Sequence, residues 1–273
     1  MEQNRQRLRK ILNRELLMTQ SQEQKLRQAA LKKKPALWKT ALKKHIPDNV
    51  YSSLESVFCK GFGIVFAQGR IVIEAGYNKR VLQEEYAVRD FAVQLTGGRK
   101  EMKHLHKGAS TSNQRNLAVT TLEGIGFGAL GVGMPDIVTF LATLLKGVYE
   151  TALSYGFDYA SRQEQMFILK MLQTALTSGS EWDRRNAAVN QMMLAESAEP
   201  AEEAFQQQLQ ETAAAFAMDM LVMKFIQGMP VVGILGGAAN PVYYSKIMKY
   251  VQLMYRKRYL LKQKRTLSGA SER

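Results

Sequence analysis

The amino-acid sequence predicts an all-α fold, a multi-helix bundle with two glycine-rich apolar tracts that form helical hairpins. Apolar residues recur at the i, i+3, i+4 spacing of an amphipathic helix through most of the chain, and no segment carries a strong strand pattern. Glycine, proline and capping residues mark the ends of the periodic segments. With 273 residues, of which 46% are hydrophobic, the chain can bury a full core.

Residues 1–46 are predicted to form a basic helical arm. Its apolar positions, such as Leu8 and Leu16, are few. Pro35 is expected to break the arm because proline removes an amide donor and clashes with the preceding turn. Trp38 stands among lysines, which suits a membrane interface and equally suits packing against the rest of the protein.

Three segments precede the first glycine-rich tract. Residues 47–75 favour a helix, although GIVFAQGRIVIEAG also has the composition of a short hairpin. Residues 78–96 predict a helix that ends at Gly97-Gly98, and residues 99–116 are polar enough for a surface loop. The apolar residues of the 78–96 helix gather near one face: Val81, Leu82, Val88, Phe91 and Leu95.

The stretch 117–160 departs furthest from ordinary composition, with five glycines in ten residues ahead of a periodic helix. Pro135 suits the first turn of that helix, and Asp136 suits the positive end of its dipole. An apolar stripe follows, and Tyr155-Gly156 closes the helix. The glycines are Gly124, Gly126, Gly128, Gly131 and Gly133, and the stripe comprises Ile137, Phe140, Leu141, Leu144, Leu145, Val148, Tyr149 and Ala152.

A capping box at Ser161 and Glu164 begins the next helix, which is expected to end at Gly179. Residues 180–203 are polar and acidic, so we expect them at the surface and partly helical. A long helix then runs from Ala201 until Gly228.

The second glycine-rich tract covers residues 230–240 and leads into the last helix. Asn240-Pro241 matches an N-cap followed by proline at the first helical position. We therefore expect one helical domain over residues 47–265 and a disordered tail over residues 266–273.

The net charge of +14 is concentrated at the two ends of the chain. Residues 1–49 hold 13 Lys or Arg against 4 Asp or Glu, residues 241–273 hold 9 against 1, and the residues between them hold 16 against 19. Cationic ends attract anionic lipid, nucleic acid or an acidic protein. The candidate membrane- or anion-binding residues are Lys32, Lys33, Lys34, Trp38, Lys43, Lys44, Arg256, Lys257, Arg258, Lys262, Lys264 and Arg265.

The segment Gly126 to Gly131 matches the G-x-G-x-x-G pattern of a dinucleotide-binding turn. Its context contradicts that interpretation, because no strand–helix alternation surrounds it and Glu150 lies within a helix. The glycines instead favour close helix packing, either inside a soluble bundle or in a re-entrant membrane hairpin. The candidate functional surface comprises Glu123, Gly124, Gly126, Gly128, Gly131, Gly133, Pro135, Asp136, Gly233, Gly236, Gly237 and Asn240.

Signatures of enzymes, metals and cofactors are weak. His104 and His106 lie between Lys103 and Lys107, which repel a cation, so we expect neither a metal nor a cofactor. The single cysteine, Cys59, has no neighbouring base and is interpreted as a buried thiol. The tyrosines and cations of the last helix suit an anionic membrane surface, with single-stranded nucleic acid as the less favoured alternative.

The glycine run with Met134-Pro135-Asp136-Ile137, the Tyr155-Gly156-Phe157-Asp158 close and the PVVGILGGAAN tract resemble the EcsC family of bacterial proteins. The resemblance is specific over residues 117–178 and 228–260 and weak before residue 50. Val138 stands where the family pattern has a second proline. The resemblance implies a mostly helical fold and work near the membrane, because the family is named after a member encoded beside an ABC transporter. It supplies no catalytic residues.

These observations lead to a hypothesis of a non-enzymatic accessory protein, cytoplasmic and peripheral to the inner membrane. The N-terminus carries no signal-peptide pattern, which agrees with that location. An anionic membrane surface is the expected partner, together with a membrane protein such as a transporter. Two alternatives stay open: an enzyme that uses Glu123 or Asp136 at the glycine run, and a nucleic-acid-binding accessory protein.

Overall fold

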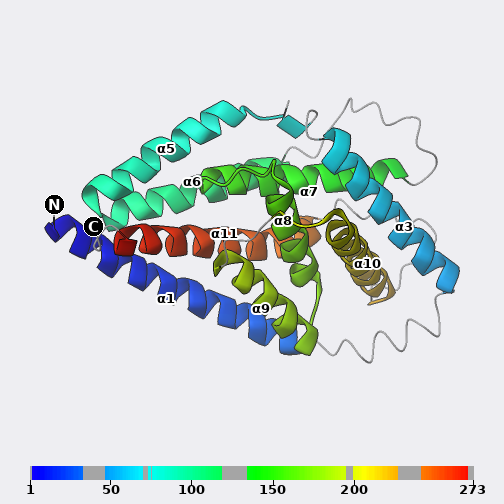
Figure 1. Ribbon diagram of the computed structural model, residues 1–273. Helices are drawn as coiled ribbons and strands as arrows, with labels where there is room; N and C mark the ends of the chain where they lie inside the picture. The colour runs from blue at the N-terminus through cyan, green and yellow to red at the C-terminus, as the bar shows by residue number, and fades with distance from the viewer. Residues whose placement is uncertain are drawn as a thin grey trace.

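The computed structural model describes residues 2–32, 47–69, 73–74, 76–118, 134–194, 199–226 and 241–269. Over these ranges the protein is all-helical and contains no strand, as predicted (Figure 1). A π-helical turn, η1 (Val65–Gly69), continues α3. The helices are α1 (Glu2–Lys32), α3 (Asp48–Ile64), α5 (Lys79–Thr96), α6 (Arg99–Ala118), α7 (Met134–Ser154), α8 (Arg162–Leu176), α9 (Ser180–Leu194), α10 (Glu202–Ile226) and α11 (Pro241–Gly269).

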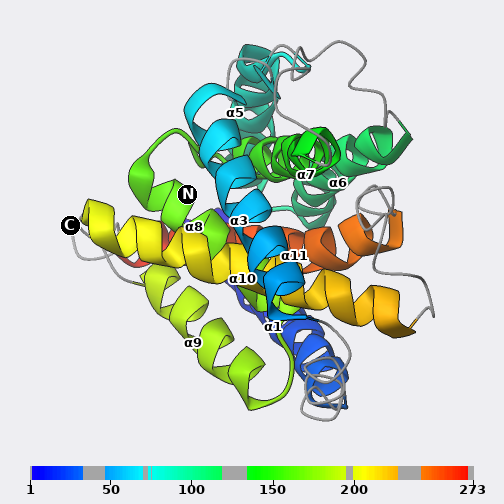
Figure 2. The same ribbon diagram turned by 90° about the vertical axis from the view of Figure 1, so that its right-hand side faces the viewer.

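Helix α11 lies at the centre of the bundle. It packs along α1 and also contacts α6, α7 and α8. Helices α1 and α11 run in opposite directions, so the start of α1 and the end of α11 lie at the same end of the molecule (Figure 1). The remaining contacts involve α9 and α10. Helix α10 packs against α3 and α8, and α9 packs against α8 and α1 (Figure 2).

Helix α7 is the core helix. Its predicted apolar stripe is buried, and so is most of its opposite face, because α3, α5, α6 and α11 surround it. The window Ile137–Ser154 is apolar and long enough to cross a bilayer, but 83% of it is buried inside the fold. The stretch Asp48–Ala67 passes the same test with 28% buried, and α3 within it packs on α10 and α7.

The prediction of a surface loop over residues 99–116 was wrong, because this segment forms most of α6. Met102, Leu105 and Ala109 recur at i, i+3 and i+7, and all three are buried. The stripe is narrow and the other positions are polar, which conceals the helical period in the sequence. Packing against α7 and α5 stabilises a helix whose composition alone does not predict it.

Two glycines end helices in left-handed backbone. Gly97 caps α5 with φ of 56°, and a Cβ there would lie 3.1 Å from the carbonyl oxygen of Asn4 and 3.2 Å from the amide nitrogen of Leu8. Gly156 follows α7 with φ of 73°, and a Cβ there would overlap the ring of Tyr86. Gly97 therefore allows the backbone of α1 to approach the α5–α6 turn closely.

Several other predicted boundaries are confirmed. The Ser161 side chain accepts a hydrogen bond from the Glu164 amide at 3.1 Å, as in a capping box, although the Glu164 carboxylate turns elsewhere. Helix α11 begins at Pro241. The helical interpretation of residues 47–75 holds for α3 and η1, where the hairpin alternative was wrong. Residues 180–194 form a full helix, more regular than predicted.

Other sequence predictions lie outside the described residues. The glycine run up to Gly133 and the whole tract 230–240 are among them, as is Pro35. At the C-terminal end, α11 continues to Gly269, beyond residue 266, where the tail was expected to begin.

Candidate functional site

Arg258 of α11 is held inside the bundle. Its Nη1 donates to both carboxylate oxygens of Glu164, at 2.8 and 2.7 Å. The guanidinium also lies over the rings of Phe157 and Phe167, with 4.2 and 4.5 Å to their centroids. Glu164 is buried and accepts a further hydrogen bond from Tyr255 at 2.7 Å. Arg258 therefore completes a buried polar contact between α11 and α8.

The two preceding cations also turn inward, onto α1. Arg256 Nη2 donates to Glu15, whose carboxylate is only 3% exposed. Lys257 Nζ donates to Glu23 and, at 2.7 Å, to Asn190 Oδ1. Arg256, Lys257 and Arg258 were predicted to bind a membrane or anion. In the structure these three residues instead form ion pairs that link α11 to α1 and α8.

The buried carboxylate of Glu15 has a strongly perturbed pKa. The imidazole of His106, 3.6 Å away, and the guanidinium of Arg256 lower the pKa of Glu15 to about 2. Burial lowers the pKa of His106. Arg256 is therefore the positive partner of Glu15 at neutral pH.

The tyrosines of α11 are core residues. Tyr243, Tyr244, Tyr250, Tyr255 and Tyr259 are all buried. Burial raises the pKa of each phenol, and Tyr259 donates to Asp90 Oδ1 at 2.6 Å. The sequence-based suggestion that these rings contact lipid or stack on bases was therefore wrong.

One end of the bundle collects cations that do face solvent. At this end the start of α1, the α5–α6 turn and the last turns of α11 converge (Figure 1). Asn4 Nδ2 donates to the carbonyl oxygen of Leu95 at 3.2 Å, and Gln94 donates to Gln263. We define the basic end as residues 2–10, 99–107 and 262–265, which carry eleven Lys or Arg against two Glu. Its cations are Arg5, Arg7, Arg9, Lys10, Arg99, Lys100, Lys103, Lys107, Lys262, Lys264 and Arg265.

An exposed apolar stripe on α5 adjoins the basic end. Val88, Phe91 and Leu95 are 69%, 65% and 60% exposed, and we call them the α5 stripe. The sequence placed them on one face of the helix, and the structure turns that face outward. The face with Leu82, Tyr86 and Val93 packs on the core instead. Large side chains exposed in a row usually mark an interaction surface.

A shallow cationic groove lies between α5 and α6 at the basic end. Its volume is about 300 Å³, and Arg89, Lys100, Lys103 and Lys107 line it together with Glu101, His104 and Ala92. Arg89 reaches it over Gly108, where a Cβ would lie 2.0 Å from Nη1. Of α5, the groove includes Arg89 and Ala92, and Ala92 lies between Phe91 and Leu95 of the α5 stripe along the helix.

The structure brings together only some of the predicted site residues. Lys262, Lys264 and Arg265 lie at the basic end, whereas Lys32 is exposed at the opposite end of α1. Pro135 and Asp136 lie in the first turn of α7, and their side chains are outside the described part. The predicted residues that lie wholly outside it are Lys33, Lys34, Trp38, Lys43, Lys44, Glu123, Gly124, Gly126, Gly128, Gly131, Gly133, Gly233, Gly236, Gly237 and Asn240.

Sequence patterns did not indicate that the cations of α6 and those at the start of α1 form one surface. The sequence did contain a pattern that indicates an interaction surface, because α5 carries apolar residues on two faces, whereas a helix that packs on the core through one face needs only one apolar face. Within the described ranges, no group of three or more metal-ligating side chains comes together.

Comparison with known proteins identifies a family. A family model described as the EcsC protein family matches residues 10–260, and so includes most of α1, for which the sequence resemblance was weak. No curated protein and no solved structure matches the chain significantly.

Proposed function

This chain belongs to the EcsC protein family, and from that premise we propose that it is a non-enzymatic accessory protein that docks peripherally on an anionic membrane surface. The docking surface is the basic end with the α5 stripe. The expected location is the cytoplasmic face of the inner membrane, where a membrane protein such as an ABC transporter is a further partner.

The observation that carries this proposal is the juxtaposition of exposed cations and exposed apolar side chains on one end of the bundle. Cations near an anionic surface contribute roughly 1 kcal/mol each. Apolar side chains that leave water contribute roughly 1.5–3 kcal/mol each when fully buried. Ala92 of α5 lines the groove together with the cations of α6, and Phe91 and Leu95 are near neighbours of Ala92 on that helix, so we expect both contributions to act in the same orientation of the molecule.

The proposal does not use the α11 tyrosines or the cations of the buried ion pairs. Those groups are satisfied inside the fold, and moving them to a lipid surface would leave Glu15 and Glu164 buried without partners. Nucleic acid also binds cations, but the described α11 tyrosines offer it no exposed rings.

Co-sedimentation with vesicles tests the proposal. We expect the protein to pellet with phosphatidylcholine vesicles that contain phosphatidylglycerol, less with phosphatidylcholine alone, and less at high salt. Equal recovery on both kinds of vesicle would contradict the electrostatic part of the proposal.

A pair of variants tests the apolar part. Phe91→Ser with Leu95→Ser removes most of the α5 stripe, and we expect weaker pelleting on the anionic vesicles. The matched control is Leu17→Ser with Leu31→Ser, which changes two exposed leucines of α1 away from the basic end. Both variants should keep the helical circular dichroism of the wild type. An equal loss of pelleting in the two variants would argue against a specific role for α5.

A further inference from the structure

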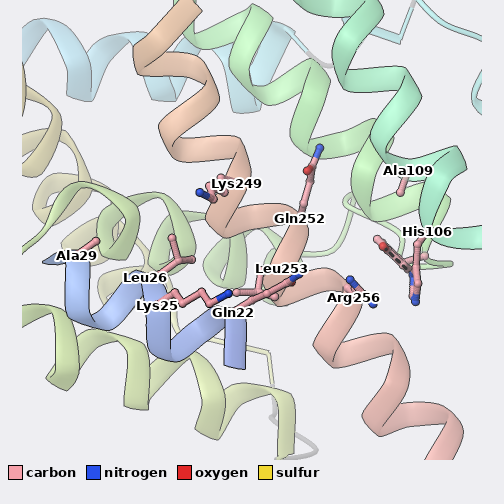
Figure 3. Close-up of a pocket in the computed structure, with 11 residues that line it drawn as sticks. Gln22, Lys25, Leu26, Ala29, His106, Ala109, Lys249, Gln252, Leu253 and Arg256 are labelled. Carbon is pink, nitrogen blue, oxygen red and sulfur yellow. Dashed lines mark hydrogen bonds between the residues drawn. The ribbon is translucent and has the colours of Figure 1, made fainter. Parts of the chain in front are cut away.

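A separate cavity lies between α1, α6 and α11 (Figure 3). Its volume is about 520 Å³, which is within the range of small-molecule sites. Lys25 extends from α1 towards α11, and Lys249, Gln252 and Arg256 project from successive turns of α11 (Figure 3).

The side chains that line this cavity are positive or neutral. Lys25, Lys249 and Arg256 line it, and no Asp or Glu does. Neither Lys25 nor Lys249 forms an ion pair with any residue in the described part of the chain. The two ammonium groups of Lys25 and Lys249, beside a guanidinium whose charge Glu15 balances, favour an anion in this hollow.

The floor of the cavity holds one unused hydrogen-bond donor. His106 Nδ1 lies 3.1 Å from the Tyr155 hydroxyl and His106 Nε2 faces the Glu15 carboxylate at 3.6 Å, whereas Arg256 Nε is buried and has no hydrogen-bond partner among the described residues. Glu15 lies behind them and holds Arg256 through Nη2, so the guanidinium is fixed before any ligand arrives. Buried donors without partners are unusual in a folded protein and require an explanation.

Part of the wall is apolar. Leu26, Ala29, Ala109 and Leu253 line the cavity together with the polar groups. A ligand with one anionic group and a small uncharged body matches this division. We propose that the cavity binds a small phosphate-bearing molecule, with Lys25 and Lys249 as the residues that contact the phosphate.

Apart from His106, which belongs to the segment 99–107, the residues that line the cavity lie outside the proposed docking surface. Lys25 lies 15 residues beyond the end of the α1 segment assigned to the basic end, which corresponds to about 22 Å along a helix. Its occupancy therefore does not depend on vesicle binding, and the two proposals can fail separately.

Isothermal titration without vesicles tests the inference. The probes are inorganic phosphate, glycerol 3-phosphate and a short-chain phosphatidic acid kept below its micelle concentration. Saturable binding of at least one probe supports the proposal. Tighter binding of the short-chain lipid identifies a phospholipid headgroup as the source, and equal binding of the lipid and glycerol 3-phosphate identifies a free phosphate ester. Failure of all three probes to bind would overturn the proposal.

Variants connect any binding to this cavity. We expect Lys25→Gln with Lys249→Gln to weaken binding at least about tenfold, because each lysine supplies a charge-assisted hydrogen bond. The matched control, Lys32→Gln with Lys60→Gln, removes two exposed charges elsewhere and should bind as the wild type does. A second variant, Ala29→Phe, narrows the cavity without changing charge and should also weaken binding. Unchanged affinity in both cavity variants would overturn the assignment.

Discussion

Helix α11 carries two groups of cations that lie within three turns of each other and serve different purposes. Arg256 and Arg258 point into the bundle and pair with the buried carboxylates of Glu15 and Glu164, and Lys257 pairs with the half-buried Glu23. Lys262 and Lys264 are exposed and belong to the basic end. The charge of a residue type therefore does not decide its role, whereas the presence of a partner carboxylate on the packed helix does. The cation-rich end of the sequence holds a structural part and a candidate docking part.

The largest expected effect concerns the structural group. Arg258→Ala leaves Glu164 buried without its bidentate partner and empties the space between two aromatic rings, so we expect a loss of about 3–5 kcal/mol of unfolding free energy. Lys264→Ala changes an exposed cation and should alter stability by less than about 0.5 kcal/mol. Urea denaturation measures both. Similar losses of stability in the two variants would contradict the distinction between the structural and the exposed cations of α11.

Low pH should weaken the ion pair between Glu15 and Arg256 and so destabilise the fold. The pKa of Glu15 is lowered from 4.5 to about 2 in the folded protein, so its stabilising contribution is complete above the unfolded value and is lost as pH falls from 4.5 towards 2. The total loss is about 3 kcal/mol. Glu15→Gln removes this titration, and its unfolding free energy should fall less steeply over that window. A wild-type protein with constant stability between pH 5 and 3 would contradict the assignment.

Gly97 lets the start of α1 pack closely against the α5–α6 turn, and both of these segments belong to or adjoin the basic end. Gly97→Ala places a side chain in left-handed backbone with φ of 56° and against the α1 backbone. We expect a loss of roughly 1–3 kcal/mol of stability. Gly63→Ala is the control, since a Cβ there meets no atom within 4 Å. Thermal denaturation measures the stability of both variants. An equally small loss of stability in Gly97→Ala and Gly63→Ala would mean that α1 does not pack closely against this turn.

The smallest expected effect on stability belongs to the α5 stripe. Phe91→Ser replaces a side chain that is 65% exposed, so stability should change by less than about 0.5 kcal/mol. Phe62→Ser, at a fully buried position, should cost several kcal/mol. Chemical denaturation of both variants shows whether Phe91 belongs to the surface or to the core.

The sequence predicted the fold class and the family well because both depend on local patterns. The apolar period of α7, the Ser161 cap and the helix start at Pro241 all involve neighbouring residues. The family match over residues 10–260 agrees with the resemblance found in the motifs. Local patterns also placed Val81, Val88, Phe91 and Leu95 of α5 on one face correctly, but they put Leu82 there too, and Leu82 packs on the core instead.

The candidate site was harder to predict because it depends on contacts between distant segments. The inward turn of Arg256 requires Glu15, which is 241 residues away in the chain. Phe91 is exposed because α5 packs on the core through its other face. Helix α6 has too few apolar residues for its sequence to predict a helix. The basic end assembles from three segments, and only the antiparallel packing of α1 and α11 brings two of them together.

The most direct test of the central claim compares two variants that remove the same number of charges. Lys100→Gln, Lys103→Gln and Lys264→Gln together alter the basic end, and Lys32→Gln, Lys60→Gln and Arg80→Gln together alter exposed cations outside both the basic end and the cavity. In co-sedimentation with phosphatidylglycerol-containing vesicles at low salt, we expect the basic-end variant to lose most of its binding and the control variant to retain it. Equal loss in both variants, or no loss in the basic-end variant, would contradict docking through this end of the molecule.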